Sequence, residues 1–443
     1  MKRLLLYSIV FLLFVGLLRA GSEPDALLDA EIAPSPVLLR PFNKMVLDSS
    51  LNAITDSVHS LDTLYQQLTR LKTASVNDGS RVVSILHLGD SHIQAGFLTG
   101  TVMRNFHRDF GNAGRGLITP LKIAKTNEPS DYVIRSNKPW TSTRLVQANR
   151  PLPLGVGGVS IGIREARFSL TVGALEKDPS ENYTFNKVRI LKYPGAPALD
   201  VDDQELSPYA HYIQDENPYV STVVLNRDVS ELTLSGQAPA NKRDSSIYYG
   251  FVLENNHNGV LYHSIGINGA QFLHWTRVSD WSQQMEVLRP DLVILSMGTN
   301  EALMGRSFSR ERFAAHIDSV VLRLRASNPE AVFLLTTPPD SYMSQRINRQ
   351  TIYKPNPLVE SVSEVIREYA DRNQLACWDL FAISGGCGSC EMWQDAALFN
   401  RDHLHFTAEG YNVLGNYLYR ALLKGYNQYV RDHYGESAPN PEI

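Results

Sequence analysis

Polar residues with complementary chemistry recur in four short segments of this chain. One segment offers a hydroxyl, Ser91, and another offers an imidazole, His405, three residues after Asp402. A serine becomes a good nucleophile when a base within about 3 Å removes its proton, and an aspartate can orient that base. The other two segments offer amide N–H donors, at Gly269 and Asn300. Together these residues could carry out nucleophilic attack on an ester carbonyl.

The negative charge that forms on the carbonyl oxygen needs hydrogen-bond donors, and each well-aimed donor commonly contributes a few kcal/mol. The candidate donors are the backbone N–H groups of Ser91 and Gly269 and the side-chain amide of Asn300. A glycine at this position lets the backbone approach the acyl group closely. Of the neighbouring acids, Asp90 is expected to brace the turn, and Glu301 to orient the loop that carries Asn300.

These segments need a framework that brings them together. Nearly continuous apolar runs, typical of strands buried on both faces, occur at residues 82–88, 260–265, 291–296, 331–336 and 376–380. Helical periodicity occurs at residues 51–71, 96–109, 281–288, 310–325, 358–373 and after 407. This alternation predicts an α/β unit with a parallel sheet, whose strands present the polar segments at their carboxyl ends.

The stretch from about residue 122 to 250 has a different pattern. It contains alternating or β-branched runs, such as residues 166–172, 187–191 and 231–234, separated by turn residues and without a convincing helix. This pattern predicts an all-β domain of sandwich or jelly-roll type. Because strands of the α/β unit precede and follow it, we expect it to be inserted into a catalytic domain formed by residues 49–121 and 251–430.

The four segments, taken in order, resemble the conserved blocks of the SGNH (GDSL-type) hydrolase superfamily. Ser91 matches that family's nucleophile, Gly269 its block II glycine, Asn300 its block III asparagine, and Asp402 with His405 its Asp-x-x-His pair. The resemblance implies a flavodoxin-like three-layer α/β sandwich in which the first block supplies the nucleophile and the last supplies the base and its orienting acid.

Within this superfamily, the chain is similar to the peptidoglycan O-acetylesterases. The similarity is carried by residues 87–93, 110–116, 262–270, 298–302, 378–381 and 385–386. His92 and Glu301 depart from the superfamily at large but agree with this branch, which also has a β-rich insertion between blocks I and II. The separation here, 269 − 91 = 178 residues, leaves room for one.

This resemblance implies hydrolysis of an O-acetyl ester on a cell-wall glycan, most specifically the C6 O-acetyl group of muramoyl residues, with the β-rich insertion as a possible glycan-binding domain. Three alternatives stay open from the sequence. The enzyme could act on another polysaccharide, it could transfer acetyl to a sugar, or the chain could be a catalytically silent glycan-binding protein.

The N-terminus has the composition of a secretory signal. Lys2 and Arg3 precede an apolar run, residues 4–18, which is followed by small residues with a cleavage site expected after Ala20. Residues 1–20 are therefore predicted to be a signal peptide, residues 21–48 a leader, and residues 431–443 a C-terminal tail. We expect an exported protein, periplasmic or secreted, without stable membrane insertion; an uncleaved anchor is the alternative.

Composition excludes several classes of protein and partner. The 443 residues are 43% apolar, which supports a sizeable core, and the formal net charge is −4, or −7 without the three basic residues of the first twenty. Such a chain lacks the excess of basic residues that nucleic-acid binding requires. Three cysteines occur, two of them as Cys387-Gly-Ser-Cys390, which suggests a local disulfide or two packed thiols. We expect neither a metal nor a cofactor.

Overall fold

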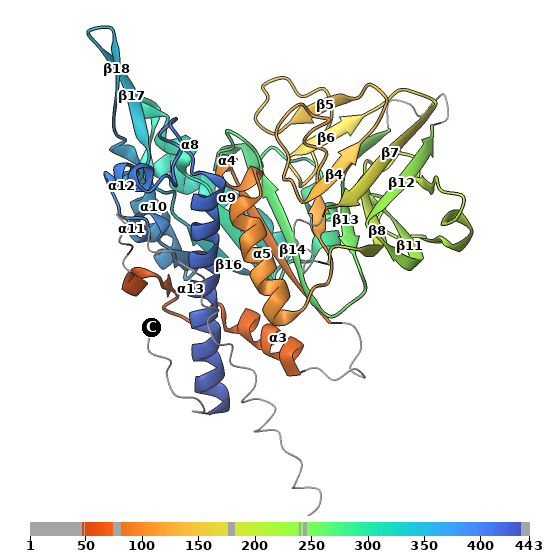
Figure 1. The fold of residues 1–443 in the computed structure, drawn as a ribbon, viewed down its shortest axis with the longest axis horizontal. Coiled ribbons are helices and arrows are strands. Elements are labelled where there is room, and N and C mark those ends of the chain that lie inside the picture. The colour runs from red at the N-terminus through yellow and green to blue at the C-terminus, as the bar shows by residue number, and fades with distance from the viewer. Residues whose placement is uncertain are drawn as a thin grey trace, which may run out of the picture.

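The computed structural model describes residue 47 and residues 49–73, 81–175, 182–238, 241 and 246–435. The predicted signal peptide, nearly all of the predicted leader and the end of the C-terminal tail lie outside this range. Figure 1 shows an α/β unit beside a unit built of antiparallel strands. Among the described residues, no helix combines the length and the apolar character needed to cross a membrane.

A six-stranded sheet forms the centre of the α/β unit. Its strands, in spatial order, are β1 (Ile54–Thr55), β19 (Ala376–Trp378), β16 (Val332–Thr336), β15 (Leu292–Ser296), β2 (Val82–Gly89) and β14 (Gly259–Gly266). β1 is antiparallel to β19, and the other pairs are parallel. The parallel strands have the flavodoxin-like order, and ligands of such sheets bind outside the carboxyl ends of the strands at the switch point, here between β2 and β15.

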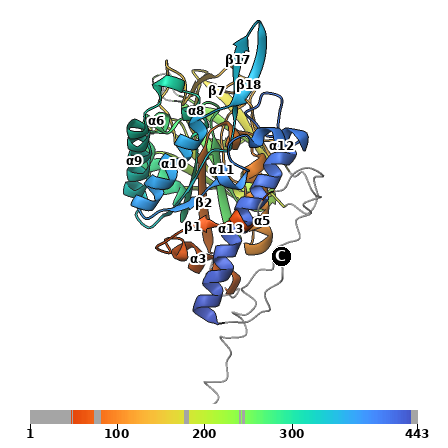
Figure 2. The ribbon, with the colours of Figure 1, turned by 90° about the vertical axis from the view of Figure 1, so that its left-hand side faces the viewer.

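Helices cover both faces of this sheet, as Figure 2 shows. One face carries α3 (Asp62–Thr73), α5 (Phe97–Phe110) and α13 (Ala408–Tyr434), and the other carries α7 (Trp281–Leu288), α9 (Arg310–Ser327) and α10 (Leu358–Arg372). Successive strand side chains point to opposite faces. On β15, Leu292 and Ile294 therefore enter one apolar core, and Val293 and Leu295 enter the other.

Short helices follow the carboxyl ends of the strands. They are α4 (Ser91–Gln94), α6 (Phe272–Trp275), α8 (Thr299–Ala302), α11 (Leu380–Ile383) and α12 (Ser389–Asp395). Three 3₁₀ turns are also described, η1 (Ser49–Leu51), η2 (Ser207–Tyr209) and η4 (Gly305–Ser307).

The β-rich unit contains two antiparallel sheets. One has the order β10 (His211–Ile213), β11 (Val220–Val229), β8 (Phe185–Lys192), β13 (Ile247–Glu254), β6 (Val159–Gly162) and β5 (Thr141–Arg144), with β3 (Gly116–Ile118) also paired to β13. The other has the order β4 (Tyr132–Arg135), β7 (Arg167–Ala174), β12 (Glu231–Gln237) and β9 (Asp200–Val201). Apolar residues of both sheets share one core, as in a sandwich.

The predicted fold class is confirmed: a parallel α/β sheet and a separate antiparallel β unit are both present. The antiparallel strands run from Gly116 to Glu254, beyond both ends of the expected range 122–250, because β3 pairs with β13. β13 then leads through a short connection into β14 of the central sheet. The β unit thus interrupts the α/β unit between the first two parallel strands of the chain.

The prediction of a helix over residues 51–71 was wrong for the first half of that range. The helix begins only at Asp62, and the residues before it form η1 and β1. The carboxylate of Asp56 accepts the backbone N–H groups of Ser60 and Leu61, at 2.8 and 2.9 Å, and this turn ends the non-helical segment. Pairing of β1 with β19 overrides the helical periodicity.

A second element has no counterpart in the sequence analysis. Strands β17 (Tyr342–Ile347) and β18 (Gln350–Pro355) pair with each other alone and project from the α/β unit, at the upper left of Figure 1. Their two-residue connection, Asn348 and Arg349, has positive φ at both positions, which is the turn geometry that matches strand twist. We call residues 342–355 the arm.

Candidate active site

Ser91 lies at the tight turn that joins β2 to α4. The carboxylate of Asp90 accepts the backbone N–H of His92 at 3.0 Å and so caps the helix that begins with the serine. A Cβ atom at Gly89 would stand 2.2 Å from Ile93 and 2.8 Å from the backbone oxygen of Ser296, so only glycine allows this close turn beside β15. Ser91 is therefore presented, partly exposed, at the switch point of the sheet.

His405 reaches Ser91 across a sequence separation of 314 residues, with 2.9 Å between its Nε2 and the serine Oγ. Its Nδ1 is 2.7 Å from Oδ2 of Asp402. Since an ionised carboxylate can only accept, Nδ1 carries the hydrogen and Nε2 accepts the serine proton. These three predicted residues therefore form a continuous hydrogen-bonded chain from hydroxyl to imidazole to carboxylate.

The turn around Asp402 keeps this carboxylate charged. Its Oδ1 accepts the backbone N–H groups of Leu404 and His405, each at 3.0 Å. Partial burial would raise the pKa of Asp402, but these hydrogen bonds and the contact with the His405 ring together hold the pKa below its ordinary value. The resulting negative charge stabilises the imidazolium that forms when the ring takes the serine proton.

The predicted oxyanion residues lie at the ends of the adjacent strands. Gly269, after β14, has φ +78°, and a Cβ atom there would find only Val146 within 4 Å, so the space beside its backbone is open. The side-chain amide of Asn300, in α8, donates to the backbone oxygen of Ala270 at 2.9 Å and to Oδ2 of Asp90 at 3.4 Å. The second bond is long and weak, so a developing oxyanion could replace it.

Asp90 and Glu301 are buried carboxyl groups beside these donors, with 1% and 2% of their surfaces exposed. Burial raises the pKa of Asp90 to about 7 and that of Glu301 to about 8. Glu301 accepts the backbone N–H of Phe272 at 2.8 Å, which ties α8 to the start of α6. Both supporting residues expected from the sequence therefore lie where they can hold the oxyanion loops together.

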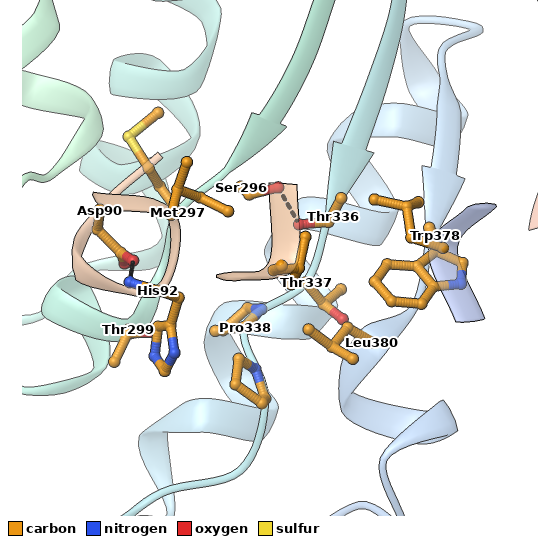
Figure 3. A pocket seen from close by; sticks show the side chains of 14 residues that line it. Asp90, His92, Ser296, Met297, Thr299, Thr336, Thr337, Pro338, Trp378 and Leu380 are labelled. Carbon is orange, nitrogen blue, oxygen red and sulfur yellow. Dashed lines mark hydrogen bonds between the residues drawn. The ribbon is translucent and has the colours of Figure 1, made fainter. Parts of the chain in front are cut away.

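A small, largely apolar pocket lies next to Asp90. Figure 3 shows Asp90 and His92 at one end of this pocket and Trp378 at the other. Between them lie the ends of β15 and β16, where the Thr336 hydroxyl donates to Ser296 Oγ at 2.9 Å. Much of the remaining lining is apolar: Ile93, Leu98, Met297, Pro338, Pro339, Leu380 and Leu418. These surroundings disfavour the charged form of a carboxyl group.

His92 belongs to the site although its sequence context assigned it no role. Its ring centroid is 5.3 Å from that of His405, and its Nδ1 is 2.9 Å from the hydroxyl of Tyr411 in α13. Burial lowers the pKa of His92 to about 3, so the ring is neutral and adds no charge next to the catalytic imidazole. No spacing signal could have identified this contact, since Tyr411 is distant in the chain.

The β-rich unit contributes a wall next to the oxyanion loop. The amide of Gln94 donates to the backbone oxygen and the side-chain oxygen of Asn127, at 2.6 and 2.8 Å. Its Oε1 accepts the backbone N–H of Asn268 at 2.5 Å, and the Asn268 amide donates to Asn127 Oδ1 at 2.6 Å. These three residues join the nucleophile helix, the oxyanion loop and the inserted unit in one network.

Metal-ligand groups and the cysteines were also candidates for chemistry. Among the described residues, no group of three or more His, Cys, Asp or Glu side chains is arranged to hold a metal ion. The three cysteines are free thiols, Cys377 and Cys390 buried and Cys387 exposed.

Comparisons with known proteins show what the chain is similar to. Residues 236–413 match the GDSL-like Lipase/Acylhydrolase family, a range that includes Gly269, Asn300 and His405 but not Ser91. A solved structure of a peptidoglycan O-acetylesterase has a TM-score of 0.63 and 21% sequence identity, covering 86% of this chain and 99% of the other. No curated protein has a significantly similar sequence.

Other solved structures match a smaller share of the chain. A lipase/acylhydrolase from Enterococcus faecalis has a TM-score of 0.29 and 18% identity over 38% of this chain and 77% of its own. An acetyl xylan esterase has a TM-score of 0.26 and 18% identity over 37% of this chain and 81% of its own. On the family match, residues 236–413 of this chain belong to the GDSL/SGNH family of ester hydrolases.

Proposed function

We propose that this protein is an exported serine esterase that removes O-acetyl groups from a cell-wall glycan, specifically the C6 O-acetyl groups of muramoyl residues in peptidoglycan. The observation that carries the hydrolytic part is the chain of hydrogen bonds from Ser91 to His405 to Asp402, at 2.9 and 2.7 Å. This arrangement activates a hydroxyl for attack on an ester.

The reaction follows from the positions of these groups. Ser91 attacks the acetyl carbonyl while His405 Nε2 takes its proton, and Asp402 stabilises the imidazolium. The N–H groups of Ser91 and Gly269 and the amide of Asn300 are the donors proposed for the oxyanion. The sugar oxygen leaves with the proton from His405, and an acetyl-serine remains. Water activated by His405 then releases acetate and restores the serine.

The glycan part of the proposal rests on the extent of the structural likeness. The peptidoglycan O-acetylesterase covers 86% of this chain, more than the α/β unit alone could supply, so the likeness extends into the β-rich unit. That unit also touches the oxyanion loop through Asn127 and Asn268. The proposal of export rests on the basic, apolar and small-residue pattern of the first twenty residues.

The test measures acetate released from O-acetylated peptidoglycan by the purified protein and by its Ser91→Ala and His405→Ala variants. We expect release by the wild type and a loss on the order of 10⁴-fold in either variant, because the triad acts as a unit. Acetate release by Ser91→Ala at the wild-type rate would contradict the serine mechanism.

A substrate panel separates the proposed glycan from its rivals. The wild type is compared on O-acetylated peptidoglycan, acetylated xylan and a small acetyl ester, with kcat/KM as the readout. We expect the highest value on peptidoglycan. A higher value on xylan would instead assign the esterase to another polysaccharide. Appearance of acetyl groups on an acceptor glycan without free acetate would identify a transferase.

A further inference from the structure

The arm (residues 342–355) rises from the same edge of the central sheet as Ser91. It follows β16, which runs parallel to β2 in the sheet, so the carboxyl ends of the two strands lie at the same edge. Figure 1 shows α4, which begins with Ser91, between the arm on one side and the β-rich unit on the other. A polymer lying across Ser91 from the β-rich unit would therefore meet the arm.

The arm is attached to the catalytic turn itself. The ring of Tyr353 stacks on His403 with centroids 3.8 Å apart, and the backbone N–H of Tyr342 donates to the His403 oxygen at 2.9 Å. His403 lies between Asp402 and His405 in the sequence and has a φ of +57°. This histidine thus anchors the arm and is not part of the hydrogen-bonded triad.

Every charged side chain of the arm is basic. Arg346, Arg349 and Lys354 are exposed, and the arm has no Asp or Glu, although the whole chain has a net charge of −4. None of the three forms an ion pair with another residue in the described part of the chain. Three uncompensated positive charges on one projecting hairpin create a local field that attracts anions.

Strand register places these charges on different faces. Arg346 is opposite Thr351, and Ser344 is opposite Tyr353. Since alternate residues and directly opposed residues share a face, Arg346 lies on the same face as Tyr353, which is the face stacked on His403. Lys354 has the opposite parity and lies on the other face. Arg349 lies in the connecting turn.

We propose that the arm is a binding site for carboxylate groups of the glycan substrate, in which Arg346 and Arg349 bind the carboxylates and Tyr353 packs against a sugar ring. This inference deepens the proposed function and rests on it: in peptidoglycan the stem peptide, or the lactyl group where it carries no peptide, supplies a carboxylate near the muramoyl O-acetyl group. Guanidinium groups suit this role because their planar donors match a carboxylate in a bidentate manner.

The chemistry of the arm favours a glycan over a lipid surface. The face that carries Lys354 does contain exposed Met343 and Ile347, at 37% and 39%. Gln345 and Gln350 interrupt this apolar face, however. Arg346 and Tyr353 lie instead on the face of the arm that contacts the turn carrying Asp402 and His405.

The first test measures binding to insoluble peptidoglycan by co-sedimentation, with Ser91→Ala as the background so that no turnover occurs. Adding Arg346→Ala and Arg349→Ala should weaken binding about tenfold, because two charge-assisted contacts are lost. Lys354→Ala removes the same charge type from the opposite face and serves as the matched control, with a change below about twofold. Binding should also weaken with added salt. Retained thermal unfolding midpoints show that the variants are folded.

The second test changes the ligand instead of the protein. Chemical amidation removes the negative charge of the peptidoglycan carboxylates that the arginines are proposed to bind. We expect amidation to weaken binding of the parent protein about as much as the double arginine substitution. It should have little further effect on the double variant. Equal binding of amidated and native polymer by the parent protein would overturn the proposal. So would equal losses for the lysine control and the arginine double variant, or arginine-dependent binding to anionic phospholipid vesicles without binding to the polymer.

Kinetics then distinguish this inference from the proposed function. In the active protein, the double arginine substitution should lower kcat/KM for O-acetylated peptidoglycan more than for a small acetyl ester. Failure of the wild type to release acetate from peptidoglycan would overturn the proposed substrate, whereas the binding comparison with native and amidated polymer would still decide the role of the arm.

Discussion

At the scale of single residues, the turn from Asp402 to His405 holds both acid and base. One carboxylate oxygen accepts two backbone N–H groups and the other faces the ring of His405, so the aspartate orients the imidazole and is itself held in place. This geometry explains how an acid and a base only three positions apart in the sequence can form the pair. The serine is positioned separately, by the cap that Asp90 provides.

Replacing Asp402 by asparagine tests this arrangement. We expect Asp402→Asn to lower kcat on a small acetyl ester by about 10²–10⁴-fold, because a neutral amide neither stabilises the imidazolium nor selects the productive tautomer. The measurement is steady-state hydrolysis at pH values where the wild type is active. Asp395→Asn, at an exposed position in α12, is the control and should retain activity. A loss below about threefold in Asp402→Asn would contradict the role given to this carboxylate.

At the scale of elements, the site is assembled from loops that belong to two units. The Gln94–Asn127–Asn268 network joins α4, the β-rich unit and the loop that carries Gly269. A loop with a glycine at positive φ is free to move unless neighbouring residues hold it. The β-rich unit therefore supports the position of Gly269, the proposed oxyanion donor, as well as forming a wall.

Asn127→Ala should disturb the position of the Gly269 N–H through Asn268, which Asn127 contacts. We expect kcat on a small ester to fall about tenfold, since small misplacements of a catalytic group are costly. The matched control is Asn217→Ala, because Asn217 also joins the β-rich unit to the α/β unit, through bonds to Gln283 and Glu286. If both variants lost activity equally, the effect would come from general loosening of the two units and not from the oxyanion loop.

At the scale of the whole molecule, the site couples function to stability through two buried carboxyl groups. Asp90 and Glu301 have pKa values of about 7 and about 8, against about 4 in an unfolded chain. Near neutral pH the unfolded chain therefore binds fewer protons at these positions than the folded protein does. Their contribution to stability is fully present below the unfolded pKa and is lost as the pH rises through the folded pKa.

This linkage predicts how stability depends on pH. The free energy of unfolding of the wild type should fall as the pH is raised from about 5 to about 8, and Glu301→Gln should reduce that decline, because a glutamine has no proton to lose. Urea unfolding at several pH values measures both. Glu330→Gln, at an exposed site, is the control and should leave the slope unchanged. A slope in Glu301→Gln as steep as that of the wild type would contradict the buried, protonated state of Glu301.

The sequence by itself determined the class of fold and the residues that could act. Residues 292–295, for example, are apolar at all four positions, a pattern typical of a strand covered on both faces. The order of the segments around Ser91, Gly269, Asn300 and His405 predicted which residues belong together, since carboxyl ends of parallel strands share one edge. These features depend on local composition and spacing, which the chain carries without folding.

Only the tertiary structure decided what depends on contacts between distant parts of the chain. The 2.9 Å approach of His405 to Ser91, the network of Asn127 and the stacking of the arm on His403 join segments that no periodicity connects. The start of α3 at Asp62 likewise depends on pairing of β1 with a strand far along the chain. Burial, and with it the raised pKa of a carboxyl group, is a property of all the atoms that surround a residue, and folding alone brings those atoms together.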